Sequence, residues 1–226
     1  MKCFAFVAVK GNIAMSDVLT ELTSENVRTV CKDFEADYKD LESALSELFA
    51  QYPKNAVRAH VLLKVVALNT LYSTQIPLYG NRIPTIWDVV DHILGLRIDD
   101  QLGSEDLVDK IAKIDAKEGR KGYYYSFATK YCSWSQTDSY PIWDSRVDLY
   151  LWTLRNNEKG KQGGLRQFKR KELWSYPEFK KVVTDFRAHF RLEEFSFKQI
   201  DEFLWTEGGK LFGPGNKQEV ILESVS

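Results

Sequence analysis

Apolar side chains recur every three or four residues along most of the chain, which is the spacing of one face of an α-helix. The segment 55–73 is apolar nearly all round, which is typical of a central, buried helix. The predicted fold class is therefore mostly α, a helical bundle with few strands. The pattern predicts helices within residues 16–50, 55–73, 85–96, 104–114, 123–134, 144–156, 177–190 and 196–208, with two or three helices in the first range.

The two ends of the chain carry the segments that look most like strands. The N-terminal run "CFAFVAV" and the C-terminal tail "EVILESV" are short and apolar, and pairing between them would give a short terminal β element. Thr85 and Ser104 are the residue types that cap helix N-termini, so we expect helices to begin there. We expect three parts: an N-terminal segment with accessory helices (1–55), a helical core (56–205) and a C-terminal tail (206–226).

Composition indicates an ordinary globular protein. The 226 residues are 44% hydrophobic and 28% charged, and no apolar run approaches the roughly 20 residues that cross a bilayer. The N-terminal run resembles a signal peptide only superficially, because it is short and no clear cleavage site follows. Cys3, Cys31 and Cys132 are scattered and form no metal-ligand spacing, so we expect reduced core thiols in the cytoplasm and no iron–sulfur cluster.

Charge is distributed unevenly although the net charge is only −1. Residues 1–50 have a net charge of −4, whereas residues 155–191 have a net charge of +7. A basic face on a near-neutral protein is typical of a surface that contacts a phosphate backbone. Lys169, Arg170 and Lys171 are its densest part. A solvated helix and loop face remains the alternative interpretation.

The sequence "PIWDSRV", Pro141–Val147, places a carboxylate where a helical pattern begins. Asp144 is a suitable N-cap, and the same position would hold a catalytic acid in a fixed orientation. Upstream, the glycine-containing segment "KEGRKG" at residues 117–122 lies between two helical patterns. A helix–glycine turn–helix can present backbone N–H groups to a DNA phosphate. Gly119 and Gly122 would permit the turn, and Arg120 and Lys121 would add positive charge.

The order helix, hairpin, helix, proline-containing loop and helix-capping aspartate resembles the helix–hairpin–helix DNA glycosylase superfamily. "FATKY" at residues 127–131 is similar to the helix after the hairpin in the archaeal 8-oxoguanine branch, and "ALNTLYSTQI" at 67–76 is similar to the first core helix and its turn. The resemblance covers about residues 58–155 and lacks the usual Leu-Pro-Gly-x-Gly hairpin pattern. It implies that Asp144 is the catalytic acid, and that Asn69, Thr74 and Gln75 are the candidates for insertion into the DNA. Arg146 is expected to pair with either Asp148 or a DNA phosphate.

A glycosylase of this type flips the target base out of the stack and into a pocket. Aromatic side chains would form the walls of that pocket, and the candidates are Tyr72, Tyr123, Tyr140 and Trp143. Members that also cut the backbone use a lysine with a depressed pKa to attack C1′. Lys130 and Lys121 are the candidates. Lys130 is alternatively a snorkelling lysine on an apolar helix, and Lys121 a phosphate-binding or exposed lysine.

The sequence therefore favours a DNA N-glycosylase that excises a damaged or modified base, including a modified base of phage DNA in a defence role. We expect it to need no metal or organic cofactor, to bind DNA and no membrane, and to act as a monomer. One alternative is a non-catalytic helical module that binds nucleic acid, in which Asp144 is only a cap. Another is a helical interaction protein whose basic segment is solvated surface.

Overall fold

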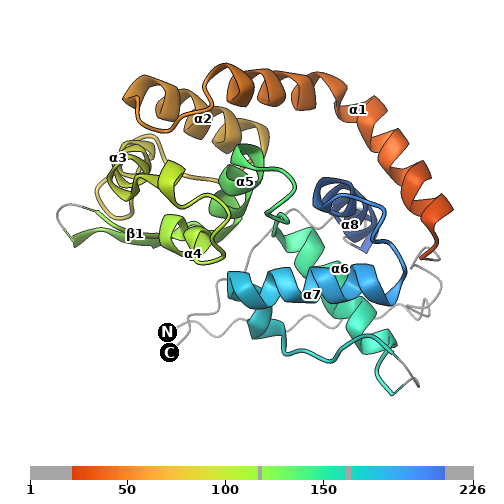
Figure 1. Cartoon of the computed structure of the whole chain (residues 1–226). Helices are drawn as coiled ribbons and strands as arrows, with labels where there is room; N and C mark the ends of the chain where they lie inside the picture. Colours follow the sequence, from red (N-terminus) through yellow and green to blue (C-terminus); the bar gives the residue numbers. More distant parts are fainter. Residues whose placement is uncertain (1–21, 117–118, 161–163, 212–226) are drawn as a thin grey trace.

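A computed structural model of the chain describes residues 22–116, 119–160 and 164–211. These residues are mostly helical, which confirms the predicted fold class (Figure 1). The helices are α1 (Ser24–Gln51), α2 (Arg58–Leu71), α3 (Ile86–Leu96), α4 (Leu107–Ala112), α5 (Tyr125–Ser135), α6 (Ser145–Asn157), α7 (Tyr176–His189) and α8 (Phe197–Leu211), with 3₁₀ turns η2 (Ile98–Asp100) and η4 (Arg170–Trp174).

The connection between α4 and α5 is a β-hairpin and not the tight glycine turn that the sequence predicted. Strands β1 (Lys113–Asp115) and β2 (Lys121–Tyr123) pair antiparallel, with Ile114 opposite Gly122. Gly122 is needed for packing, because a Cβ there would lie 2.9 Å from Pro84 Cδ. Gly119 has a φ of +74°, a conformation that glycine adopts at no steric cost. The predicted terminal strand pairing involves residues outside the described ranges.

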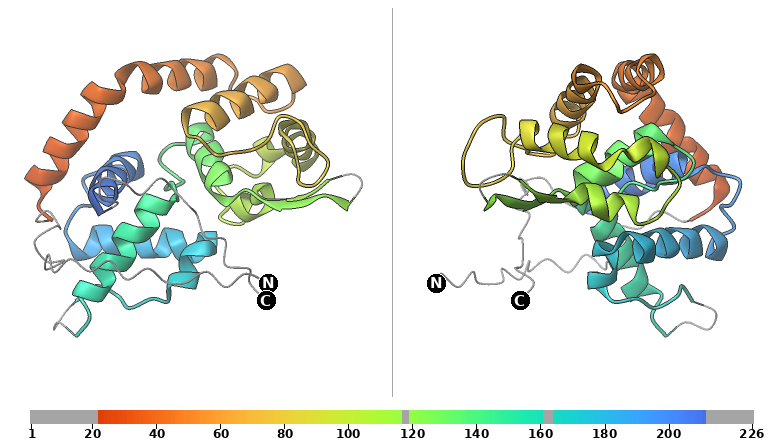
Figure 2. Two further views of the ribbon diagram at one scale, coloured as in Figure 1. Left: turned by 180° about the vertical axis from the view of Figure 1, so that it is seen from behind. Right: turned by 60° about the vertical axis from the view of Figure 1, so that its left-hand side comes forward.

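The helices form two groups that α1 bridges. Helices α2 to α5 and the hairpin lie on one side, and α6 to α8 lie on the other, with α1 running along both (Figures 1 and 2). Helix α1 contacts α2, α5 and α8, and its buried residues join the same hydrophobic core as the rest of the chain. Helices α6 and α8 approach closely because Gly208 has no side chain: a Cβ there would lie 2.3 Å from the Arg146 carbonyl oxygen.

Several helix limits differ from the sequence predictions for local reasons. From Ser24 onward, α1 is one helix of 28 residues, not two or three, because nothing in this stretch interrupts its apolar face. Helix α4 begins after Asp106, and Ser104 instead donates a hydrogen bond to that carboxylate. Thr85 is confirmed as the N-cap of α3. Helix α8 continues to Leu211, so the boundary predicted after residue 205 falls inside a helix.

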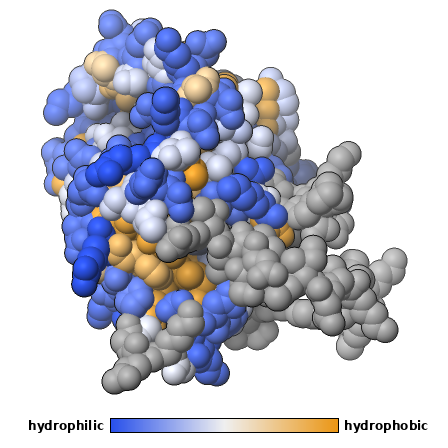
Figure 3. Space-filling view, turned by 90° about the vertical axis from the view of Figure 1, so that its right-hand side faces the viewer, coloured by the Kyte–Doolittle hydropathy of each residue, from blue (hydrophilic) through white to orange (hydrophobic). Residues whose placement is uncertain are grey.

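The side of the molecule seen in Figure 3 is mostly hydrophilic, with an apolar area toward its lower part. Across the described ranges, none of the helices combines the length and the apolar character needed to cross a bilayer. The large apolar side chains that are exposed come mainly from α2, α3 and the segment between them, and they include Leu63, Leu78, Tyr79, Ile83 and Trp87.

A buried lysine lies where α1, α2 and α5 meet. The side chain of Lys64 is fully buried, and its Nζ donates a hydrogen bond to Asn55 Oδ1 at 2.9 Å and lies 4.9 Å from the centre of the Phe49 ring. The same Asn55 oxygen accepts a hydrogen bond from Tyr131 Oη of α5 at 2.7 Å. Burial lowers the pKa of Lys64 to about 8.

This lysine makes the stability of the fold depend on pH. The folded state loses the Lys64 proton at about pH 8, whereas the unfolded chain keeps it to about pH 10.5. At this residue the unfolded state therefore binds more protons in this interval, so the contribution of Lys64 to the free energy of unfolding rises by about 1–3 kcal/mol as pH rises through it. We expect Lys64→Met to remove this gain in urea unfolding curves measured at several pH values. An equal gain in wild type and variant would contradict the assignment.

Candidate functional site

The amine of Lys130 is buried in the centre of the described structure. Lys130 lies on α5 with 3% of its side chain exposed. Its Nζ donates a hydrogen bond to Ser126 Oγ at 2.7 Å, one helical turn earlier, and lies 3.5 Å from the carbonyl oxygen of Trp143. The distance from Nζ to Asp144 Oδ2 is 3.9 Å. The snorkelling interpretation of Lys130 is therefore wrong, because the amine points inward.

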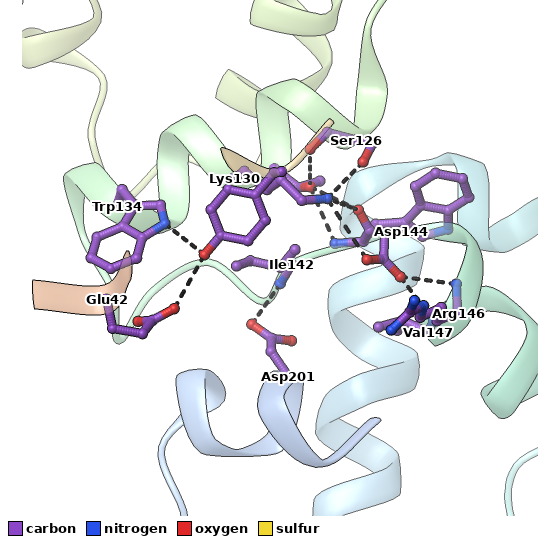
Figure 4. Close-up of polar contacts among 12 residues, drawn as sticks. Glu42, Ser126, Lys130, Trp134, Ile142, Asp144, Arg146, Val147 and Asp201 are labelled. Carbon is purple, nitrogen blue, oxygen red and sulfur yellow. Dashed lines mark hydrogen bonds and ion pairs between the residues drawn. The ribbon is translucent and has the colours of Figure 1, made fainter. Parts of the chain in front are cut away.

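Asp144 is the N-cap of α6, as the sequence predicted. Its Oδ1 accepts hydrogen bonds from the backbone N–H groups of Arg146 at 2.9 Å and Val147 at 3.1 Å. Its other oxygen, Oδ2, faces the Lys130 amine (Figure 4). Capping and the contact with Lys130 thus use different oxygens of one carboxylate, so the cap fixes the direction in which the second oxygen points.

The loop before Asp144 is held at three consecutive residues. The carbonyl oxygen of Pro141 accepts a hydrogen bond from Tyr176 Oη at 3.2 Å. The N–H of Ile142 donates to Asp201 Oδ2 at 2.8 Å, and the N–H of Trp143 donates to Thr129 Oγ1 at 3.2 Å. These contacts come from α7, α8 and α5. The position of Asp144 is therefore set by three helices in addition to its own.

Burial dominates the electrostatics of this cluster. Burial lowers the pKa of Lys130, and the carboxylates of Asp144 and Asp201 oppose that shift. Burial also raises the pKa of Asp201 well above its usual range, although its hydrogen bond from Ile142 favours the charged form. Asp201 Oδ1 is buried without a hydrogen-bond partner. A neutral lysine is the nucleophilic form of the amine, and burial increases the fraction of Lys130 in this form.

Aromatic and charged side chains surround the pair on the side of α1 and α8. The Lys130 amine lies 5.5 Å from the centre of the Tyr72 ring. The Tyr72 hydroxyl accepts a hydrogen bond from Trp134 Nε1 at 3.1 Å and lies 3.5 Å from Glu42 Oε1. Figure 4 shows Trp134 and Glu42 on one side of Lys130 and Asp144 on the other. Of the predicted base-pocket residues, Tyr72 is the one whose ring faces the Lys130 amine.

A groove of about 340 Å³ adjoins the N-terminus of α6. Phe34 and Tyr38 of α1 and Trp205 of α8 supply aromatic walls, and the Arg146 guanidinium lies 3.9 Å from the centre of the Trp205 ring. The backbone N–H of Arg146 donates to Asp144, so the groove and the carboxylate share this residue. Arg146 is therefore placed beside the candidate site, but its charged group is stacked on an indole in the described structure.

The other predicted pocket residues support the fold around the site. Tyr140 is fully buried, where its hydroxyl accepts the N–H of Gly103 and donates to the carbonyl oxygen of Ser104. Trp143 packs against Tyr125 and Trp174, with ring centres 5.2 and 4.4 Å away. Tyr123 lies on β2 and donates to Asp109. Tyr140 and Trp143 belong to the aromatic core, which the sequence did not distinguish from a pocket, whereas Tyr123 is 46% exposed.

The predicted DNA-contacting residues are dispersed in the structure. Arg120 forms an ion pair with Asp88 at 2.9 Å, with only 15% of the Arg120 side chain exposed. Lys121 lies on β2 with its amine 3.6 Å from Asp115, and the hairpin formed by β1 and β2 extends away from α6 (Figure 1). The hairpin therefore offers a DNA phosphate less free charge than the sequence suggested. The Lys121 amine is also not brought to Asp144.

The turn after α2 is braced from within by Asn69. Its Oδ1 accepts hydrogen bonds from Thr74 Oγ1 and the N–H of Ile76, both at 2.8 Å, and its Nδ2 donates to the Ile76 carbonyl oxygen. Gln75 is exposed at the tip with a φ of +60°, a conformation that side chains other than glycine rarely adopt. Asn69 thus shapes the turn, and Gln75 is the residue that the turn presents to solvent.

The basic segment is partly used within the protein. Arg170 forms an ion pair with buried Asp148 at 2.5 Å, and Arg166 pairs with Asp185 and Glu178. Lys169 and Lys171 flank Arg170 and are exposed. The predicted phosphate-binding surface is therefore smaller than the charge count of the segment implied. Its exposed part also includes Lys159, Lys181 and Arg191.

Sequence reasoning missed three residues around Lys130 and Asp144, which are Ser126, Thr129 and Asp201, and the neighbouring buried acid Glu202. Ser126 and Thr129 lie one turn and one residue before Lys130, and their small hydroxyls gave no signal in an apolar helix. Asp201 and Glu202 are adjacent acids within the apolar pattern of the last helix, where both side chains are buried. Acids at core positions are uncommon without partners, and this was the signal that could have identified them.

The fold and the site define a mostly helical protein with a buried lysine beside a helix-capping aspartate. Residues 15–139 match the family model described as the HI_0787_N N-terminal domain, and the chain belongs to this family. A protein of Haemophilus influenzae, named only as an uncharacterized protein, is 36% identical over 137 residues. The match covers 59% of this chain and 62% of the relative, so the chain spans less than two thirds of that protein. No solved structure matches the chain significantly.

The hydrogen bond from Ile142 to Asp201 gives a test of how the loop is held. Asp201→Asn keeps an acceptor oxygen for the Ile142 N–H, whereas Asp201→Ala leaves this buried donor without a partner. We expect the alanine variant to lose about 1–3 kcal/mol more unfolding free energy than the asparagine variant in urea titrations at pH 7. Equal losses in the two variants would show that the loop does not depend on this acceptor.

Proposed function

We propose that this protein is a DNA N-glycosylase that excises a damaged or modified base and uses Lys130 as nucleophile and Asp144 as the electrostatic partner. The observation that carries the proposal is the buried amine 3.9 Å from a carboxylate whose other oxygen caps a helix. The resemblance noted from the sequence places a catalytic aspartate at the same helix start. Modified bases of phage DNA are included in the proposed substrates, with a defence role in the cytoplasm.

In the proposed reaction, the neutral Lys130 amine attacks C1′ of a flipped nucleotide. The C1′–N bond breaks, and the base leaves with the bonding electrons and takes up a proton. The Asp144 carboxylate stabilises the positive charge that develops on the sugar at C1′ and O4′. The lysine nitrogen then transfers a proton to O4′ as the C1′–O4′ bond opens, which leaves a protonated Schiff base between Nζ and C1′ and a hydroxyl group on C4′.

The surroundings support each requirement of this chemistry. Burial lowers the pKa of Lys130, so a larger fraction of the amine is neutral near pH 7 than for an exposed lysine. The aromatic ring of Tyr72 lies beside the amine, and Trp134 is hydrogen-bonded to the Tyr72 hydroxyl. The groove at Phe34 and Trp205 offers further aromatic faces for stacking a flipped base. The proposal assigns Gln75, which is exposed at the tip of the strained turn after Tyr72, to the space that the flipped base leaves.

A non-catalytic nucleic-acid-binding module is the second candidate, favoured by the exposed Lys169 and Lys171. Under this alternative, the Lys130–Asp144 pair only stabilises the fold. Both candidates predict DNA binding that weakens as salt concentration rises, because phosphate contacts release counterions. They differ in whether the protein forms a covalent bond with DNA.

Borohydride trapping on DNA that contains an abasic site distinguishes the two candidates. A Schiff base at C1′ is reduced to a stable protein–DNA adduct, which is measured as a shifted band on a denaturing gel. We expect wild-type protein to be trapped, and both Lys130→Gln and Lys130→Met to lose trapping by at least about 100-fold, since neither side chain can form an imine. Lys121→Gln changes the other candidate lysine, is exposed, and should trap like wild type.

Circular dichroism and DNA affinity of each variant provide the controls for folding and binding. DNA binding by the wild-type protein without any trapped adduct or released base would contradict the glycosylase and favour the binding module. Absence of DNA binding at low salt would contradict both candidates. Trapping that survives in Lys130→Met but disappears in Lys121→Gln would show that the assignment of the nucleophile is wrong.

A further inference from the structure

A second charged cluster lies across the Tyr72 ring from Lys130. Lys198 of α8 forms ion pairs with Glu42 of α1 at 2.9 Å and with Glu202, one helical turn later, at 3.8 Å. We call these three residues the Glu–Lys–Glu cluster. Their side chains are 17% exposed for Lys198, 20% for Glu42 and 7% for Glu202. The cluster therefore faces the interior between α1 and α8, with limited access to solvent.

The hydrogen-bonding capacity of this cluster is not used up within the protein. Glu202 Oε2 is buried without a hydrogen-bond partner. A buried acceptor that lacks a partner costs free energy comparable to a lost hydrogen bond, so natural proteins seldom retain one without a use. The cluster has two carboxylates for one ammonium group, and it therefore combines spare acceptors with a donor.

Aromatic faces border the cluster. The Lys198 amine lies 5.0 Å from the centre of the Trp134 ring and 5.8 Å from that of Phe34. Tyr72 connects the cluster to the proposed reaction centre, because its hydroxyl lies 3.5 Å from Glu42 Oε1 and its ring centre lies 5.5 Å from the Lys130 amine. Aromatic walls with a polar end are the arrangement by which proteins hold a flat heterocycle and read its edge.

We infer that Glu42, Lys198 and Glu202 form the subsite that reads the hydrogen-bonding edge of the target base. The ligand is a heterocycle whose edge presents N–H donors to the carboxylates and an acceptor atom to the Lys198 ammonium group. The Glu202 carboxyl contributes its buried oxygen Oε2, and the weakly donating Cys31 thiol also interacts with this carboxyl. This inference rests on the proposed glycosylase function.

The charge state of Glu202 fits this role. The pKa of Glu202 is raised to about 7, mainly by burial and also by the negative charges of Glu42 and Glu35. The Lys198 ammonium group and the Cys31 thiol oppose this increase. A carboxyl group that is close to half protonated at neutral pH can accept or donate a hydrogen bond. The ion pairs around Glu202 also hold α1 against α8. A test must therefore distinguish a base-reading subsite from a network that only stabilises the fold.

Two assays on the same variants separate recognition of the base from the chemistry at C1′. Abasic-site DNA contains no base, so borohydride trapping on it requires Lys130 but not the Glu–Lys–Glu cluster. Release of a base requires both. The release substrates are duplex oligonucleotides that carry one 8-oxoguanine, hypoxanthine, uracil or thymine glycol, and the released base is measured by mass spectrometry.

We expect Glu42→Gln, Lys198→Met and Glu202→Gln to slow base release by roughly 10- to 100-fold, because each removes or weakens a charged partner in a buried site. Trapping on abasic DNA should stay within about twofold of wild type, as no contact to C1′ changes. Glu194→Gln is the matched control. Glu194 lies just before α8 begins and forms an exposed ion pair with Arg28 of α1. The substitution breaks this pair and should change neither assay.

The outcomes distinguish failure of the subsite from failure of the enzyme. Base release and trapping that fall together, or that both remain unchanged, would overturn the subsite and leave a structural ion network. Wild-type protein that traps abasic DNA but releases no base of the panel would also overturn it. Wild-type protein that neither traps nor releases would overturn the glycosylase and the subsite together. Selective loss of release establishes the subsite.

Discussion

The structure around the candidate site depends on the burial of one amine. A charged lysine in the interior costs several kcal/mol unless it is neutral, paired or hydrogen-bonded. Lys130 is supported by Ser126 on its own helix and by the carboxylate of Asp144, which begins the next one. Because Asp144 caps α6, its carboxylate is held in a fixed direction. The contact of the buried Lys130 amine with this carboxylate therefore joins α5 to the start of α6.

The same requirement extends to the helices that hold the loop. Residues 141–143 lead into Asp144. The Pro141 carbonyl oxygen, the Ile142 N–H and the Trp143 N–H each form a hydrogen bond with a side chain of a different helix. Helix α8 supplies Asp201 to this loop and Lys198 to α1, so it connects the loop to the long N-terminal helix. Gly208 allows α8 to lie against the backbone of Arg146, which brings these groups within reach. The site is therefore assembled by α1, α5, α6 and α8 together.

Local patterns were sufficient to predict where most of the helices lie and two of the three expected caps, because apolar periodicity and N-cap chemistry act within a few residues. Asp144 and Thr85 illustrate this: each stands immediately before the helix that it caps. The connection at 113–123 was mispredicted because β pairing depends on both arms of a hairpin, and the glycines suggested a tighter turn. Residues from different helices, such as Glu42, Asp201 and Lys198, could not be grouped from sequence, since tertiary packing alone brings them together. Whether Lys130 pointed outward or inward was likewise decided by packing.

The most direct test of this account is the titration of Lys130 itself, followed by NMR in protein labelled at lysine Cε. The account predicts a pKa below the ordinary value of about 10.4, because burial disfavours the charged amine. It also predicts a further decrease in Asp144→Asn, since the asparagine retains the cap but removes the negative charge that favours the ammonium form. A Lys130 that titrates at the ordinary value, or that is unaffected by Asp144→Asn, would contradict the central claim that burial and Asp144 together control this amine.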